Sequence, residues 1–205
     1  LIPASPDHPW EKTLTRSTVL KLALGTPLTG RAMSDGSALL QVIDVHVDIQ
    51  GRKRVTEILH GVSVDLEQGT MRGLVGETGS GKSMTARAVM NLLPPGGSVV
   101  KGSILLQGRE LVGLADEELH EVRGPVISMV FQNPRAALYP MLSVEAQLSN
   151  IIKAHRNLNK NQRRERIRRY LEMVGMPDPE RVARAYPHEL SGGMAQRVVI
   201  AAALI

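Results

Sequence analysis

The chain has 205 residues, a formal net charge of +5 at pH 7 and no cysteine. Its length suits one main domain with a subdomain, and the lack of cysteine excludes disulfides, cysteine-bound zinc and iron–sulfur clusters within this stretch. No apolar run approaches the ~20 residues that span a bilayer, and no signal peptide is visible. We therefore expect any role at a membrane to depend on a partner.

The chain begins with an irregular stretch and then turns to strand patterns. Residues 1–38 are rich in proline and glycine and show little periodicity, which predicts a poorly ordered extension. Leu39–Ile49 is partly alternating and predicts a strand. Gly51–Arg54 predicts a turn, and the alternation from Val62 to Leu66 predicts a second strand.

A glycine-rich loop lies between a predicted strand and a predicted helix. Met71–Val75 is a short apolar run that predicts a strand, and the loop follows it directly. Ser83–Leu93 has a helical pattern, which Pro94–Gly97 brings to an end. Ser103–Gln107 predicts another strand.

The character of the sequence then becomes helical. A short helix is expected over Asp116–Arg123, and Val126–Phe131 predicts a buried strand. From about residue 141 to residue 190 the pattern predicts a helical subdomain, within a domain that covers residues 39–205. Together the patterns predict an α/β core with a β-rich N-terminal subdomain and a helical insert.

Within the helical stretch, capping residues mark several boundaries. One helix face is expected to carry Val144, Leu148, Ile151, Ile152 and His155, and Ser143 is the expected N-cap. Another face is expected to carry Ile167, Leu171 and Val174, and Gly175 is placed to stop that helix. The prolines that follow predict a loop, after which a last helix opens at Ser191.

The glycine-rich loop has the composition of a phosphate-binding loop. Lys82 is expected to reach the terminal phosphates of a nucleotide, and the Ser83 hydroxyl is expected to ligate Mg²⁺. Glycines let backbone N–H groups point at phosphate oxygens, and the following helix adds the positive end of its dipole. The strand and helix on either side disfavour a chance glycine turn. The pattern G-x-x-x-x-G-K-[ST] is complete in Gly76, Glu77, Thr78, Gly79, Ser80, Gly81, Lys82 and Ser83.

Two later motifs separate the classes of protein that share such a loop. Phe131-Gln132-Asn133-Pro134 follows an apolar strand, and Ser191-Gly192-Gly193-Met194 opens a helix. In this order, with helices between them, they resemble the Q-loop and the signature motif of ABC ATPases. The resemblance covers about Leu39–Ile205, and it implies a P-loop NTPase core that binds ATP and Mg²⁺.

The resemblance also implies roles for these residues. Gln132 would contact Mg²⁺ and the attacking water, so Lys82 and Gln132 are the catalytic candidates. The signature would contact the γ-phosphate of ATP held by another subunit, and Ser191 suits an N-cap beside which a phosphate can approach two glycines. An ordinary glycine-started helix is the alternative when this motif is taken alone. The remaining nucleotide-binding candidates are Ser191, Gly192, Gly193, Met194 and Gln196.

Finer details resemble the ATPases of peptide and nickel importers. These are Leu138-Tyr139-Pro140 and the lead Tyr186-Pro187-His188-Glu189, with Met194 after the glycines. The resemblance implies a peripheral subunit on the cytoplasmic face of the inner membrane that couples ATP binding and hydrolysis to import of peptides or a related solute. Its partners would be a second ABC ATPase subunit, identical or a paralogue, two integral permease subunits and, indirectly, an extracytoplasmic solute-binding protein.

The sequence departs from the family pattern in two places. The family stacks adenine on an aromatic side chain near the end of the first strand, where this chain has Ile49. After the signature helix the family has a strand ending in Asp-Glu (Walker B) and later a switch histidine, and the chain stops at Ile205 before them. We therefore expect a C-terminally incomplete domain that does not hydrolyse ATP by itself.

Two other interpretations stay open at this level. A truncated nucleotide-binding remnant would explain the apparently cut ends. A non-transport ABC protein acting on nucleic acid would use the arginines of residues 163–169, although no aromatic side chains are interleaved with them for base stacking. A solvated helix face explains the same arginines more simply, so no nucleic-acid partner is expected.

Overall fold

The computed structural model describes residues 19–22 and 38–205. Apart from Val19–Leu22 and residue 38, the predicted extension over residues 1–38 lies outside the described residues. The chain divides into two compact units, and among residues 38–205 the division lies between Met129 and Val130. Below, residues 38–129 are called the sheet unit and residues 130–205 the helical unit, and each is described by itself.

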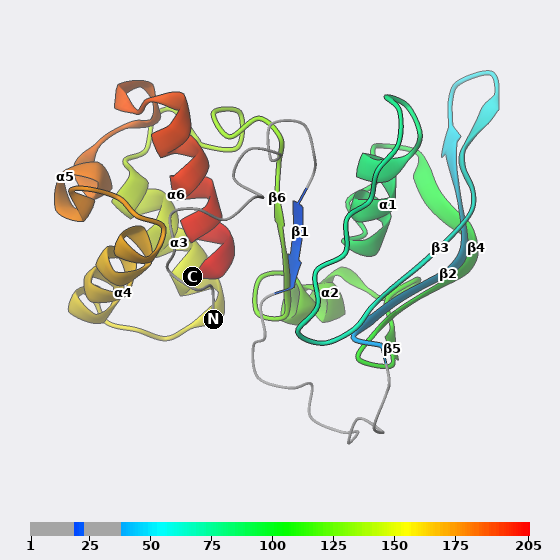
Figure 1. Ribbon diagram of the computed structural model, residues 1–205, viewed down its shortest axis with the longest axis horizontal. Coiled ribbons are helices and arrows are strands. Elements are labelled where there is room, and N and C mark those ends of the chain that lie inside the picture. Colours follow the sequence, from blue (N-terminus) through cyan, green and yellow to red (C-terminus); the bar gives the residue numbers. More distant parts are fainter. Residues whose placement is uncertain (1–18, 23–37) are drawn as a thin grey trace. The chain divides into compact units, whose positions relative to one another are not determined.

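The sheet unit is built on one antiparallel sheet in the order β3-β2-β4-β5 (Figure 1). The strands predicted at 39–49, 62–66 and 103–107 are confirmed, and all are part of somewhat longer or shifted elements. A two-stranded sheet pairs β1 with β6. The bounds are β1 Val19–Leu22, β2 Leu40–Gln50, β3 Val55–Leu66, β4 Gly97–Leu106, β5 Arg109–Glu110 and β6 Ile127–Val130.

A bulge in β2 changes which side chains face the core. Leu40 and Val42 are buried, and after the irregularity at residues 43–44 the buried positions become Val45 and Val47. Asp44 has φ 47°, a left-handed conformation that is uncommon outside glycine. A bulge of this kind lets an extra residue enter one strand without moving the apolar face of the rest.

The strand predicted at Met71–Val75 is wrong. The structure has no strand in this segment, and Met71 is 88% and Val75 94% exposed. A strand needs a neighbouring backbone to pair its N–H and C=O groups, and none of the described residues pairs with this segment. An apolar run is therefore insufficient here without an adjacent strand.

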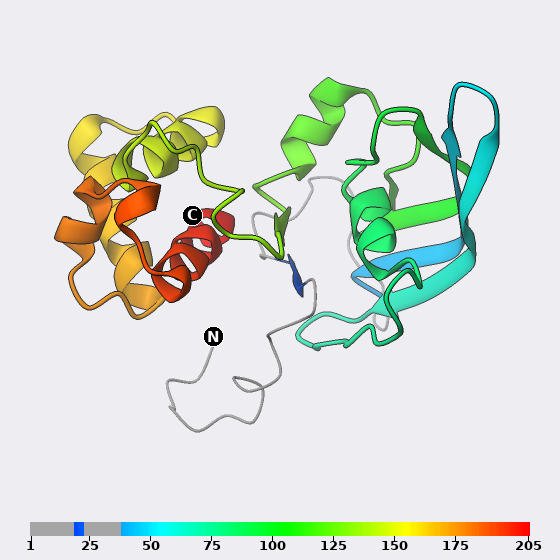
Figure 2. The same cartoon turned by 90° about the horizontal axis from the view of Figure 1, so that it is seen from above.

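Two helices belong to the sheet unit, α1 (Lys82–Val89) and α2 (Asp116–Val122). Helix α1 lies against one face of the sheet, as Figure 2 shows from above. It ends earlier than the predicted Leu93 because Asn91 adopts φ 48°, and the Arg123 side chain donates to the carbonyls of Met90 at 2.8 Å and Asn91 at 2.7 Å. These bonds satisfy carbonyls at the helix end.

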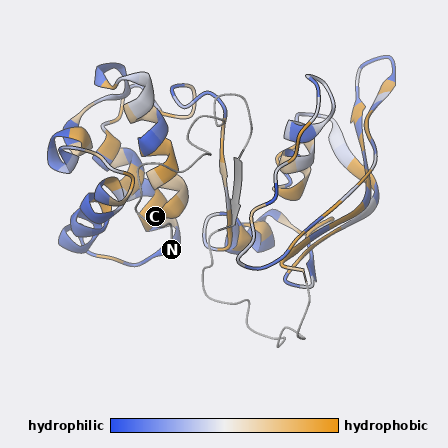
Figure 3. Cartoon of the chain, viewed as in Figure 1, coloured by the Kyte–Doolittle hydropathy of each residue, from blue (hydrophilic) through white to orange (hydrophobic). Residues whose placement is uncertain are grey.

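The helical unit buries one continuous apolar cluster among its helices. Figure 3 shows the hydrophilic stretch along α4 and the apolar residues of α6. The predicted N-cap Ser143 and the helix stop at Gly175, with φ 76°, are confirmed. The bounds are α3 Val144–His155, α4 Lys160–Met173, α5 Pro179–Arg184, the 3₁₀ helix η2 Pro187–Glu189 and α6 Gly192–Leu204.

The loop predicted around the prolines at 177, 179 and 187 is partly wrong, because it contains α5 and η2. Asp178 caps α5 by accepting a hydrogen bond from the Arg181 N–H at 3.0 Å. Pro179 occupies the first turn, where its missing N–H costs nothing. Proline thus starts these short helices rather than excluding them. No helix among the described residues is long and apolar enough to cross a membrane.

Candidate nucleotide-binding site

The loop of residues 76–83 is exposed up to Ser80 and then enters α1. Gly79 has φ 90° and Gly81 has φ 86°, which are conformations that glycine adopts without steric cost. A Cβ on Gly76 would lie 2.6 Å from the Ser80 Oγ, so the loop closes tightly on itself at that point. The loop conformation therefore favours glycine at positions 79 and 81, and Gly76 lies close against Ser80.

The Lys82 side chain folds back over this loop. Its Nζ donates to the carbonyl oxygens of Gly76 and Glu77, each at 2.6 Å, and to the Ser80 Oγ at 3.1 Å. The ammonium group is therefore held above the loop by oxygen atoms of the loop itself. Phosphate oxygens offer the same kind of acceptor with more negative charge, so the donor set suits a polyphosphate.

Helix α1 begins in a way that leaves its first turn available to an anion. Its N-cap is Gly81, which has no side chain to accept the first N–H groups, and the first turn contains no acidic residue. Thr85 anchors the turn instead, since its N–H and its Oγ1 both donate to the Gly81 carbonyl, at 2.8 and 3.0 Å. The positive end of the helix dipole consequently faces the loop without an internal counter-charge.

Strand β3 supports the start of α1. A Cβ on Gly81 would lie 2.5 Å from the Cδ2 of Leu59, which is a buried residue of β3. The Leu59 side chain therefore packs directly against the backbone at the start of α1. The contact could not be predicted from the motif, since the pattern requires glycine at this position for the phosphate alone.

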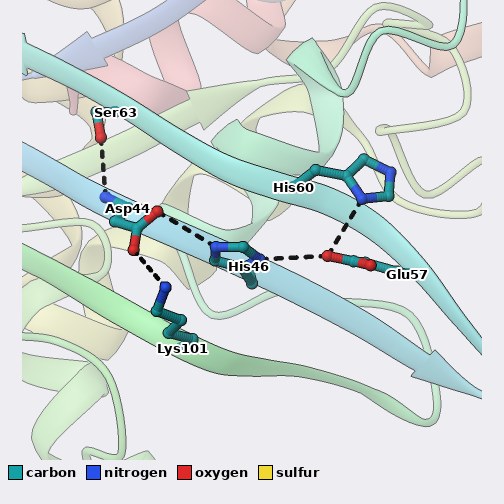
Figure 4. A network of polar contacts seen from close by, with 6 residues as sticks. All are labelled: Asp44, His46, Glu57, His60, Ser63 and Lys101. Atoms are coloured by element: carbon teal, nitrogen blue, oxygen red, sulfur yellow. Dashed lines mark hydrogen bonds and ion pairs between the residues drawn. The ribbon is translucent and has the colours of Figure 1, made fainter.

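A polar network lies beside the bulge in the same sheet (Figure 4). His46 lies 3.2 Å from both Asp44 Oδ1 and Glu57 Oε1, and Lys101 Nζ lies 2.8 Å from Asp44 Oδ2. Contacts with Lys101 and then His46 hold the pKa of Asp44 below its ordinary value. Hydrogen bonding to His46 and to His60 holds the pKa of Glu57 below its ordinary value. The network joins β2, β3 and β4.

In the helical unit, Gln132 is an exposed residue of the loop after β6. The Asn133 Oδ1 accepts from the Ala136 N–H at 3.3 Å, which turns the chain just after it. Arg135 then donates from Nη2 to the carbonyl of Leu190 at 3.1 Å. This bond ties the loop of Gln132 to the residue before the signature motif, and sequence reasoning missed Arg135 because nothing in its local pattern marks it.

The signature motif forms the start of α6 as predicted. The Ser191 Oγ accepts from the Met194 N–H at 3.2 Å, and a Cβ added to Gly192 or Gly193 would meet nothing within 4 Å. Met194 is half-buried and Gln196 is exposed. The two glycines therefore lie under open space at the positive end of a helix.

The predicted residues thus fall into two groups. Gly76–Ser83 form one loop in the sheet unit, whereas Gln132 and the Ser191–Gln196 turn belong to the helical unit, where Arg135 links their segments. Ile49, at the position where the family has an adenine-stacking aromatic, is a half-buried residue near the end of β2 and pairs with Thr56 of β3.

Comparison with known proteins agrees with this arrangement. The sequence model described as "ABC transporter" matches residues 59–205. The chain belongs to the ABC transporter family. The match includes the phosphate loop, Gln132 and the signature turn, so all three motifs lie within the part of the chain that defines this membership.

Relatives within the ABC family include peptide-transport ATP-binding proteins. The dipeptide transport ATP-binding protein DppD of Bacillus subtilis is 42% identical over 82% of this chain and 50% of its own length. The oligopeptide transport ATP-binding protein OppD of the same organism is 41% identical over 81% of this chain and 47% of its own length. The chain thus spans about half the length of these curated relatives.

Solved structures show the ABC cassette fold for this chain. The dimeric ATP-binding cassette MJ0796 in a post-hydrolysis state with ADP and Pi is 26% identical, with a TM-score of 0.68, over 80% of this chain and 68% of that one. A second dimeric structure of MJ0796 has a TM-score of 0.67 at 25% identity, with the same coverage. The predicted α/β cassette with a β-rich N-terminal region is therefore confirmed.

Proposed function

We propose that this chain is the nucleotide-binding part of an ABC transporter subunit that couples ATP binding and hydrolysis to the import of peptides or a related solute. The observation that carries the proposal is the Lys82 ammonium group held over the glycine loop by Gly76, Glu77 and Ser80. The names of the relatives DppD and OppD support peptides as the transported class.

The loop of residues 76–83 would hold the phosphates of ATP. Backbone N–H groups of the loop and of the first turn of α1 would donate to phosphate oxygens. Lys82 would exchange its loop acceptors for the β- and γ-phosphates. Ser83 is an exposed residue in the first turn of α1. Its hydroxyl would bind Mg²⁺, since this ion prefers oxygen ligands. The ion would neutralise charge that develops on the phosphates.

Gln132 would be the second catalytic residue for the bound nucleotide. Its amide is exposed, and it would contact Mg²⁺ and orient the attacking water. Arg135 would keep its loop in register with the signature turn through the Leu190 carbonyl. We assign Gln132 as a catalytic candidate and Arg135 as a positioning residue.

The signature turn would contact ATP bound by a second ATPase subunit. Its N–H groups, with Ser191, Met194 and Gln196 around them, would face the γ-phosphate of that nucleotide, and the open space over Gly192 and Gly193 admits it. The MJ0796 cassette structures are dimeric, which supports such a pairing. The second subunit would be an identical copy or a paralogue.

We place the subunit at the cytoplasmic face of the membrane, bound to two integral permease subunits and served by an extracytoplasmic solute-binding protein. The helical subdomain, at about residues 141–190 of a cassette domain that starts at residue 39, would carry the permease contact. Co-purification of the intact protein with two integral membrane proteins is the expected result. Recovery of the protein with nucleic acid and no membrane protein would contradict the assignment.

The test of the transport function is uptake by the assembled transporter in vesicles. We expect ATP-dependent uptake of a labelled di- or oligopeptide, lost in Lys82→Ala and retained in Lys101→Ala, which changes a matched surface lysine.

Lys82 and Gln132 are a cation and an amide, so neither supplies a carboxylate that polarises water. We therefore expect the 205-residue chain alone to bind ATP without turning it over, which a phosphate-release assay checks.

A further inference from the structure

Helices α3 and α4 line an open hollow of about 340 Å³ on the helical unit. Its apolar floor includes Ile167, which is 1% exposed. The hollow lies wholly within one compact unit, so its geometry is independent of the other unit. Its polar lining comes from α4, from α3 and from the α3 N-cap, and consists of Ser143, Glu145, Ser149, Lys153, Lys160, Arg163 and Arg164.

The lining carries an excess of positive charge. Four of its side chains are cationic, and the one carboxylate, Glu145, accepts from the Nε of Arg164 at 2.7 Å. Within the lining, this one pair leaves three positive charges unbalanced. Among the described residues, neither Lys153 nor Lys160 takes part in an ion pair. The hollow is thus cationic even though its most exposed arginine is paired.

Arg163 is held in place by bonds that do not use all of its donors. Its Nε donates to the Ser149 Oγ at 2.9 Å, and its Nη1 donates to the carbonyl of Leu158. No hydrogen bond from its Nη2 is found within the described part of the chain. A guanidinium fixed in this way has lost its side-chain freedom before any ligand arrives, which lowers the cost of binding.

The placement of these cations opposes the stability of α4 itself. The first turn of α4 has no acidic residue, so Lys160, Arg163 and Arg164 gather at the positive end of the helix dipole. They are also spaced three and four residues apart, where like charges repel. Arg168, further along the same helix, lies instead between Glu165 and Glu172 and is fully paired. An anion bound in the hollow would relieve the repulsion among Lys160, Arg163 and Arg164 at the start of α4. Arg168 already has its counter-charges.

We propose that the α3–α4 hollow binds a phosphate group. The planar donors of Arg163 and Arg164 fit the oxygens of a phosphate, and Lys153 and Lys160 add charge around them. The three unbalanced positive charges match a phosphate dianion better than a single carboxylate. A free phosphate and the headgroup of an anionic phospholipid share this chemistry, and the experiment distinguishes the two sources.

The experiment titrates inorganic phosphate into the intact protein and into two variants. Arg164→Gln removes a cation of the hollow, whereas Arg184→Gln removes a paired, exposed arginine of α5 outside it. Both variants retain the phosphate loop of residues 76–83, and a saturating non-hydrolysable ATP analogue is present throughout. Circular dichroism checks that both variants keep their helices. We expect phosphate affinity to fall about tenfold in Arg164→Gln and to stay unchanged in Arg184→Gln.

The second arm uses vesicles of phosphatidylcholine with and without phosphatidic acid. Binding only to the phosphatidic acid vesicles, reduced by Arg164→Gln, assigns the site to a lipid headgroup, whereas phosphate binding without vesicle binding assigns it to a free anion. Phosphate affinity that is absent, or that falls equally in both variants, overturns the proposal. Binding of a polyglutamate peptide in place of phosphate also overturns it, in favour of an acidic protein segment.

Discussion

The phosphate loop and the signature turn are both glycine-containing starts of helices, yet they are built differently. In the phosphate loop, Gly79 and Gly81 adopt left-handed conformations and Lys82 bonds to the loop carbonyls. In the signature turn, Ser191 caps the helix, and the space over Gly192 and Gly193 is open. The first pair of glycines serves the shape of its own loop. The second pair is not needed for the packing of its own turn, and we propose that it leaves room for the nucleotide of a second subunit.

The largest effect that we predict is a loss of ATP affinity in Lys82→Ala. The variant loses charge-assisted hydrogen bonds to phosphate, which are worth about 2–3 kcal/mol, so ATP affinity of the intact protein is expected to fall about 100-fold. Isothermal titration calorimetry measures the affinity. Lys101→Ala, which removes a lysine paired with Asp44 in the same unit, is the matched control and should bind ATP normally.

The second prediction concerns ATP hydrolysis and the signature turn. Gly193→Glu places a carboxylate where the γ-phosphate of the ATP held by the second subunit is expected. ATP hydrolysis by the assembled transporter should therefore fall at least about tenfold. The same carboxylate is compatible with a helix N-terminus, so the fold should persist. Gly193→Ala is the control for backbone change. Hydrolysis that is unaffected by Gly193→Glu would contradict the assigned role of this turn.

A smaller effect concerns stability and separates the two kinds of glycine. Gly81→Ala forces a left-handed residue with a Cβ against Leu59, so the sheet unit should lose about 1–2 kcal/mol of unfolding free energy. Gly192→Ala, at the first position of α6, should cost nothing and can stabilise by ~0.5–1 kcal/mol. Urea unfolding of both variants compares them. Equal losses would mean that both turns depend on glycine conformation.

The smallest effect is a pH dependence of stability that arises from the polar network around Asp44 in the sheet. Lys101 and His46 keep the pKa of Asp44 below its unfolded value. Its contribution to stability is therefore complete above a pH of about 4 and is lost as the pH falls through the folded pKa. Urea midpoints measured from pH 6 to pH 3 should fall less in Asp44→Asn than in the unchanged protein. Asp48→Asn, on the same strand, serves as the control.

Local chemistry explains which features the sequence could predict. The glycine loop, the caps Ser143 and Ser191 and the helix stop at Gly175 depend on neighbouring residues, and the structure forms all of them. The prediction of a strand at Met71–Val75 was wrong because a strand depends on a partner that is distant in sequence. The contacts of Arg135 with Leu190 and of Gly81 with Leu59 were missed for the same reason.

The proposed roles of the site residues rest on the same distinction. The motif predicts that Lys82 and the loop hold phosphate because every residue involved lies within eight positions. The pairing of the signature turn with a second subunit involves another chain, so it follows only from the family and from the open space over its glycines. Experiments on nucleotide binding and on hydrolysis therefore test different parts of the account.

The most direct test measures ATP affinity of the intact protein at low protein concentration, with Lys82→Ala and Gly193→Glu side by side. We predict that Lys82→Ala binds ATP about 100-fold more weakly. Gly193→Glu should change the affinity by less than about twofold, because we propose that its turn contacts the nucleotide of another subunit. Unchanged ATP affinity in Lys82→Ala would contradict the central claim that residues 76–83 form the nucleotide site.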